Sequence, residues 1–100
     1  MDGHRTAERR SLAYHRAIAL RLTEDAGLIE RARARVRSWR QPEIHVRWIE
    51  AWSALLDRPI ADVCRMLVDD SEQMTALRQM TPFAGILDAR ARWSVWRTVR

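Results

Sequence analysis

The sequence contains no lysine, no asparagine and only one cysteine, Cys64. A single cysteine cannot form an intrachain disulfide, and its isolation is typical of a reducing compartment. No apolar run approaches the roughly 20 residues that a bilayer-spanning helix needs. Residues 1–10 are charged and lack the apolar segment of a secretory signal. We therefore expect a cytoplasmic protein that does not interact with a membrane.

Clustered metal ligands and catalytic motifs are also missing. The three histidines and Cys64 lie on separate segments, and none forms the close ligand pair that structural zinc sites usually show. The sequence has no GxSxG elbow and no glycine-rich phosphate loop. The carboxylates of Asp69, Asp70 and Glu72 suit the start of a helix, where acidic groups are favourable. These absences predict a protein that is not an enzyme and holds neither metal nor cofactor.

Glycine and proline are scarce, with three of each, whereas hydrophobic residues make up 47% of the 100 residues and charged residues 31%. This balance is typical of one soluble globular domain. The formal charge of +5 is unevenly distributed: residues 1–40 have 10 arginines against 5 acidic residues, residues 41–88 have 4 against 8, and residues 89–100 have 4 against none. Such an order favours ion pairs between segments, or an ionic partner, over a uniform nucleic-acid-binding surface.

Apolar residues recur at helical spacing along most of the chain, and no strand pattern competes with them. The expected N-caps are Ser11, Ser71 and Asp88, and Pro59 suits the first turn of another helix. We predict an all-α fold, a compact bundle of five or six short helices. Residues 1–10 are expected to form a flexible N-terminus, residues 11–80 the helical core, and residues 81–100 a turn followed by a basic helix.

Four bulky side chains lie on the apolar stripes of these predicted helices. His15 falls on the stripe of the first helix, so we expect it to be half-buried and hydrogen-bonded. Trp39, Trp48 and Trp52 lie on the stripes of the second and third helices, which end and begin around Gln41–Pro42. Their spacing predicts core positions for all three rings.

An unusual apolar turn interrupts the last two helical patterns. Residues 77–87 read LRQMTPFAGIL and contain the only phenylalanine. Pro82 cannot continue a helix and Gly85 can adopt a positive φ, so a turn of fixed shape is expected between Thr81 and Leu87. Loops normally lie at the surface, yet this one is hydrophobic. It therefore either fills the core of its own domain or is presented to a partner.

The segment that follows the turn combines tryptophan with arginine. Trp93 and Trp96 lie three residues apart within residues 89–100, which contain no acidic residue, so we expect them on one face of the last helix. Tryptophan and arginine dominate interface hot spots, and arginine can stack on indole rings. We therefore hypothesise that the turn and the last helix bind a partner protein, through Arg78, Pro82, Phe83, Gly85, Ile86, Leu87, Arg90, Arg92, Trp93, Trp96 and Arg97.

Nucleic-acid binding by the second predicted helix is an alternative hypothesis, because guanidinium groups recognise phosphate well. The candidate residues are Arg31, Arg33, Arg35, Arg37 and Arg40. A solvated face in an arginine-rich chain would look the same, and the third helix is acidic and tryptophan-rich where a helix-turn-helix would present it. A small DNA-binding transcriptional regulator and an accessory helical subunit of an enzyme both remain open.

Five segments occur in the order found in a group of small bacterial proteins: YHRAIA (14–19), LIERAR (28–33), WSALL (52–56), LRQMTPFAGIL (77–87) and RW (92–93). Over residues 11–100 the chain resembles this group, whose second half ends in an LRQ-x-(S/T)-PFAG-(I/V)-L block and a basic, tryptophan-containing helix. The group is associated with the antitoxins of two-gene toxin–antitoxin modules. The resemblance implies a non-catalytic inhibitor that neutralises a cognate intracellular toxin protein, with operator DNA as a second candidate partner.

Overall fold

A computed structural model describes residues 3–40 and 43–99 of the chain, and within these ranges it contains six α-helices and no strand. The helices are α1 (Gly3–Glu24), α2 (Leu28–Ser38), α3 (Val46–Leu56), α4 (Ile60–Leu67), α5 (Glu72–Arg78) and α6 (Ala89–Trp96). The predicted all-α bundle is confirmed. Among the described residues, no helix has the length and apolar character needed to cross a membrane.

The first helix begins much earlier than the sequence pattern indicated. α1 starts at Gly3, so Ser11 lies inside the helix and is not its N-cap. Residues 3–10, which the sequence pattern left outside the first helix, are helical. The residues of this segment have no apolar periodicity, so the pattern gave no signal for a helix before Ser11. At the end of the segment, Arg10 lies over the Trp96 ring of α6.

Polar side chains begin three of the helices. Ser71 Oγ accepts a hydrogen bond from the backbone N–H of Met74 at 3.2 Å, and Asp88 Oδ1 accepts one from Ala91 N–H at 2.8 Å. Both predicted N-caps are therefore confirmed. At α3 the cap is His45, whose Nδ1 accepts from the N–H two residues later. Pro59 is the N-cap of α4, and the break expected at residues 41–42 lies outside the described residues.

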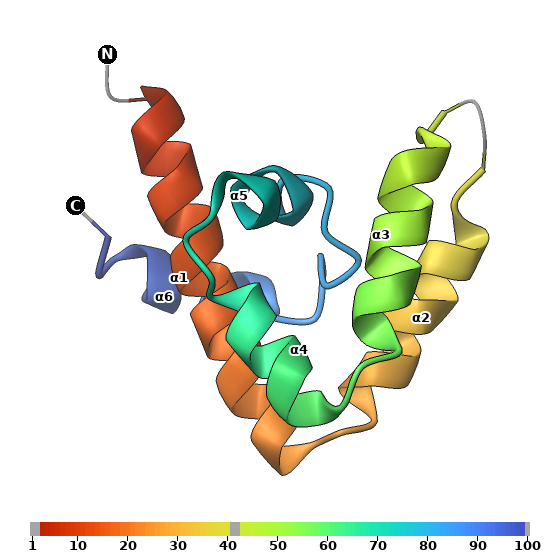
Figure 1. Cartoon of the computed structure of the whole chain (residues 1–100). Helices are drawn as coiled ribbons and strands as arrows, with labels where there is room; N and C mark the ends of the chain where they lie inside the picture. The colour runs from red at the N-terminus through yellow and green to blue at the C-terminus, as the bar shows by residue number, and fades with distance from the viewer. Residues whose placement is uncertain (1–2, 41–42, 100) are drawn as a thin grey trace.

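The helices form two arms (Figure 1). α1 packs against α4 and α6 in one arm, α2 packs against α3 in the other, and α5 contacts α1, α3 and α4. After α5, the chain runs through the space between the arms before it reaches α6. The apolar turn of residues 81–87 therefore lies inside the bundle, where side chains from both arms can enclose it.

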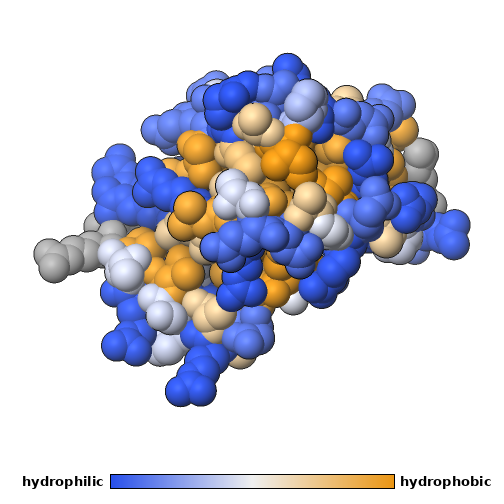
Figure 2. All heavy atoms as spheres, turned by 90° about the horizontal axis from the view of Figure 1, so that it is seen from below, coloured by the Kyte–Doolittle hydropathy of each residue, from blue (hydrophilic) through white to orange (hydrophobic). Residues whose placement is uncertain are grey.

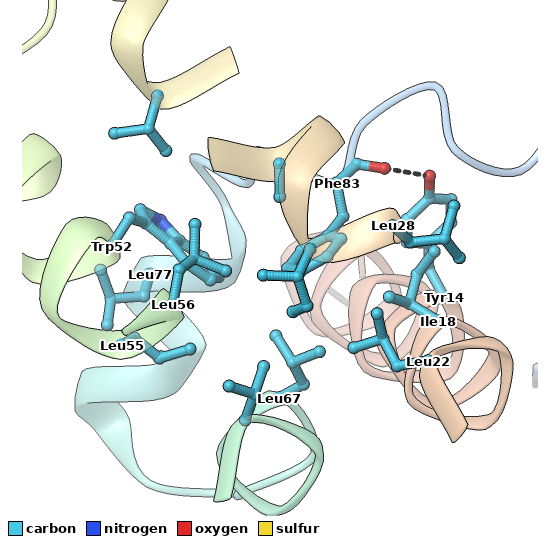
Figure 3. Packing of buried hydrophobic residues seen from close by; sticks show 14 of the residues in the cluster. Tyr14, Ile18, Leu22, Leu28, Trp52, Leu55, Leu56, Leu67, Leu77 and Phe83 are labelled. Carbon is cyan, nitrogen blue, oxygen red and sulfur yellow. Dashed lines mark hydrogen bonds between the residues drawn. The ribbon is translucent and has the colours of Figure 1, made fainter. Parts of the chain in front are cut away.

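Phe83 occupies the centre of the hydrophobic core and has no exposed surface. Its ring meets the edge of Trp52 from α3, with 6.1 Å between the ring centroids. Figure 3 shows it among side chains of both arms, including Ile18 of α1 and Leu56 of α3. Trp52 is fully buried, as the sequence predicted, and Trp39 and Trp48 are partly buried against the same core. Also fully enclosed in this core are Leu22, Ala32, Val63, Leu67 and Leu87.

Candidate functional site

Tyr14 of α1 holds the second half of the turn, residues 83–87, at its two ends. Its hydroxyl donates a hydrogen bond to the carbonyl oxygen of Phe83 at 2.6 Å, which Figure 3 marks with a dashed line. The same oxygen accepts from the backbone N–H of Leu87 at 3.4 Å. A buried phenol needs such partners, and here the hydroxyl forms hydrogen bonds with two backbone groups that lie outside any helix. No motif in the sequence marked this role of Tyr14, although its spacing of four to Ile18 places both on one helical face.

His15, the next residue of α1, fixes the first half of the turn. Its Nδ1 lies 2.7 Å from the carbonyl oxygen of Ser11, which can only accept, so Nδ1 carries the proton. Its Nε2, 2.8 Å from Thr81 Oγ1, then accepts from the hydroxyl, and Thr81 Oγ1 accepts from the N–H of Phe83 at 3.1 Å. Burial lowers the pKa of His15 from 6.5 to about 4; the positive charge of Arg78 adds to this, and the Ser11 carbonyl opposes it.

A bend at the tip of the turn gives it its shape. The N–H of Ile86 donates to the carbonyl oxygen of Phe83 at 3.2 Å, and Gly85 has a φ of 84°. A β-turn with positive φ at its third position is the type II turn, which favours glycine there. Gly85 is exposed and Ile86 is half-buried against the core. The structure thus bears out the fixed turn that Pro82 and Gly85 predicted.

Four residues of the hypothesised interface are enclosed by the protein itself. Phe83 has 0% of its surface exposed, Leu87 1% and Arg78 3%, and Pro82 is also buried. A partner could reach these side chains only if the domain opened, so the prediction that they contact a partner must be corrected. The apolar turn fills the core because the two arms leave a space that the helices alone do not occupy.

Arg78 has a structural task at the junction of α4 and α5. Its Nη1 donates to the carbonyl oxygens of Leu67 at 3.2 Å and Asp69 at 2.6 Å, and its Nη2 donates to Thr75 Oγ1 at 3.3 Å. Burial lowers the pKa of Arg78, while Asp70 and Asp69 act against this shift. The guanidinium therefore closes the C-terminal end of α4, where carbonyl groups lack helical partners.

The outward side of α6 remains accessible. We use the name α6 face for Arg90, Trp93 and Arg97, which line a hollow together with Asp88, Ala91 and Ser94. Trp93 is 58% exposed, and α6 has no buried residue. Among the described residues that line this hollow, Asp88 is the only acidic one, and it is engaged as the N-cap of the helix. The α6 face therefore combines a large apolar ring with two cations.

Arg92 and Trp96 lie toward α1 and do not line that hollow. The guanidinium carbon of Arg92 is 5.3 Å from the centroid of the Trp96 ring, and that of Arg10 from α1 is 5.5 Å from it. Both distances suit cation–π stacking. The indole nitrogen of Trp96 is buried and has no hydrogen-bond partner within the described part of the chain, so stacking is what holds this ring. Sequence reasoning paired the two tryptophans on one face, and the structure separates them.

The five candidate arginines, four on α2 and Arg40 just after it, divide into two groups. Arg33 Nη2 donates to the carbonyl oxygen of Leu56 at 2.9 Å, and its Nη1 lies 3.6 Å from Asp57 Oδ1, so this residue ties α2 to the end of α3. The remaining four candidates are exposed: Arg31, Arg35, Arg37 and Arg40. Only these four are free to meet phosphate groups.

Neither metal binding nor thiol chemistry finds support within residues 3–40 and 43–99. No group of three His, Cys, Asp or Glu side chains in these ranges could hold a metal ion. Cys64 Sγ lies 3.5 Å from the carbonyl oxygen of Ala19, and burial raises the pKa of the thiol. His45 serves as the cap of α3.

The fold and the α6 face define a small all-α protein with a turn buried between two arms and one basic, tryptophan-bearing surface. No protein-family model, curated protein or solved structure matches this chain. Its function must therefore be argued from its own surfaces.

Proposed function

We propose that this protein is a non-catalytic binding protein of the antitoxin kind, which neutralises a cognate intracellular toxin by presenting its α6 face. The observation that carries the proposal is the exposure of Trp93, 58%, on a helix without a buried residue. Burying a tryptophan removes a large apolar surface from water, and such rings dominate hot spots when arginines flank them. Arg90 and Arg97 supply that setting in the same hollow.

The charge of the α6 face indicates which partner surface it suits. Arg90 and Arg97 are exposed, and no acidic side chain other than the capping Asp88 lines their hollow among the described residues. An acidic surface around an apolar pocket would complement it, steering the encounter and receiving the Trp93 ring. The acidic metal-binding cleft of a toxin that acts on RNA or nucleotides has this character.

In this proposal the buried turn supports the interface without forming it. Leu87 is anchored through its N–H to the hydroxyl of Tyr14, and Asp88 follows it as the N-cap of α6. The turn thereby fixes where α6 starts, although Phe83 and Leu87 themselves are enclosed. Preorganisation of this kind lowers the entropic cost of binding.

The test is binding between this protein and the product of the neighbouring gene, measured by calorimetry, together with the activity of that product. We expect a stable complex and loss of the neighbour's activity. Trp93→Ala should weaken the complex by about 30-fold, the size of a hot-spot loss. Leu20→Ala is the matched control, because Leu20 is 70% exposed on α1, away from the α6 face.

Three outcomes would count against the proposal. One is the absence of a complex, and another is a complex that Trp93→Ala and Leu20→Ala weaken equally. The third is a neighbour whose activity rises when this protein is added, which would indicate an accessory subunit of an enzyme.

Nucleic-acid binding by α2 is retained as a second candidate, because Arg31, Arg35 and Arg37 are all exposed on one short helix. This version predicts salt-dependent binding to DNA upstream of the gene. Replacing these three arginines with alanine should abolish binding without unfolding the domain. Binding that persists in this triple variant would exclude α2 as the DNA-binding element.

A further inference from the structure

A cavity of about 250 Å³ lies where α1, the turn and α6 meet. Ala7 and Tyr14 of α1, Ala84 and Gly85 of the turn, and the ring of Trp96 form much of its wall. This hollow shares no lining residue with the one on the α6 face. Its size is near the lower end of the range seen for small-molecule pockets.

Two positive charges line this mainly apolar cavity, whose other polar lining residues are Ser11, Tyr14, His15 and Thr81. Arg10 and Arg92 both lie over the Trp96 ring, with guanidinium carbons 5.5 and 5.3 Å from its centroid. Among residues 3–40 and 43–99, neither forms an ion pair and no acidic side chain lines the cavity. Like charges that share one ring repel each other, and an anion placed between them would remove this repulsion.

We propose that this cavity binds a small aromatic carboxylate. The flat ring would lie against the alanine side chains and the indole of Trp96, and the carboxylate would accept hydrogen bonds from Arg10 and Arg92. Guanidinium groups match carboxylates in charge and planarity, so this pairing is favourable in a partly desolvated site. A bare inorganic anion would leave the apolar wall uncovered, and an uncharged ring would leave the two arginines uncompensated.

This site is independent of the proposed inhibitor function, because it is formed by different residues of α6. The α6 face depends on Trp93, Arg90 and Arg97, whereas the cavity depends on Arg92, Trp96 and α1. Loss of partner binding in Trp93→Ala should therefore leave carboxylate binding unchanged.

The experiment is a calorimetric titration of the full chain with 2-naphthoate, 2-naphthamide and inorganic phosphate. We expect saturable binding of 2-naphthoate, about tenfold weaker binding of the uncharged amide, and none of phosphate. Arg10→Gln and Arg92→Gln should each weaken 2-naphthoate binding by about tenfold, because each removes a charged hydrogen-bond donor. Arg90→Gln is the matched control and should bind as the unaltered chain does.

Circular dichroism and thermal unfolding of each variant separate lost binding from lost folding. A folded Arg92→Gln variant that binds 2-naphthoate with unchanged affinity would overturn the proposal. Equal affinities for 2-naphthoate and 2-naphthamide would also overturn it, as would an equal loss in Arg90→Gln. Failure of 2-naphthoate to saturate the unaltered chain has the same consequence.

Discussion

The neutral imidazole of His15 forms two hydrogen bonds, one as a donor and one as an acceptor. Its Nε2 accepts from the hydroxyl of Thr81, and a protonated ring would have no lone pair left for that bond. Protonation would also place a positive charge near that of Arg78, on a side chain that is buried, since His15 is 1% exposed. The folded state therefore favours the neutral imidazole, and the pKa of His15 falls to about 4 from the 6.5 of an unfolded chain.

Acid should weaken the fold through His15. Its pKa falls from 6.5 to about 4 on folding, so between these pH values the unfolded chain binds the extra proton and the free energy of unfolding drops as pH falls. The full loss is about 3 kcal/mol. Urea titrations at several pH values would measure it. His15→Gln should flatten this dependence, whereas His45→Gln should retain it; equal slopes in all three chains would contradict this account.

Arg78 illustrates a cation used as a hydrogen-bond donor inside the domain. Arg78→Met should lower the free energy of unfolding by about 3 kcal/mol, because the carbonyl oxygens of Leu67 and Asp69 lose a charged donor. Arg78→Lys should recover part of the loss, since a single ammonium cannot reproduce the fork. Urea midpoints measure both. Unchanged midpoints in Arg78→Met would show that solvent replaces the donor and that the residue is not structural.

At the scale of elements, the helices differ in how far the sequence specified them. α5 and α6 begin where Ser71 and Asp88 predicted, because a short polar side chain before an apolar period is a local signal. The start of α1 carried no such signal, since residues 3–10 have no apolar period. Arg10 lies over the Trp96 ring of α6, and a contact so distant in sequence is not encoded in local spacing.

Trp93 of α6 should contribute little to the stability of the domain. The helix has no buried residue, and Trp93 is 58% exposed. Trp93→Ala should change the free energy of unfolding by less than about 0.5 kcal/mol, whereas Trp52→Ala, which empties a fully buried site, should cost about 3–5 kcal/mol. Guanidinium chloride unfolding distinguishes them. A large loss in Trp93→Ala would mean that α6 serves the core and is unavailable to a partner.

At the scale of the whole molecule, the apolar turn lies inside the helical bundle. Seen from below the view of Figure 1, the surface shows hydrophobic areas bordered by hydrophilic side chains (Figure 2), and the turn residue Phe83 contributes nothing to the exposed surface. The sequence predicted the turn and its glycine correctly. It did not predict whether the turn lies in the core or at the surface, because a turn that fills a core and a loop that binds a partner need the same apolar residues. The spacing between the two arms decides whether the turn lies in the core or at the surface, and that spacing arises from contacts distant in sequence.

The position of Phe83 between the arms makes a prediction about cooperativity. Its ring lies 6.4 Å from that of His15 in one arm and 6.1 Å from that of Trp52 in the other. Phe83→Ala should therefore cost about 3–5 kcal/mol and accelerate amide hydrogen exchange in both arms together. Met80→Ala is the control, since Met80 lies just before the turn and is 36% exposed.

Faster exchange confined to α2 and α3 in Phe83→Ala would contradict this prediction. It would mean that the α2–α3 pair opens as a separate unit and that the turn belongs energetically to the α1 arm alone. Tyr14 and His15 hold the turn to α1 by hydrogen bonds, whereas the described contact of Phe83 with α3 is an aromatic edge. Joint acceleration therefore requires that burial of the Phe83 ring, and not backbone hydrogen bonding, joins the two arms into one folding unit.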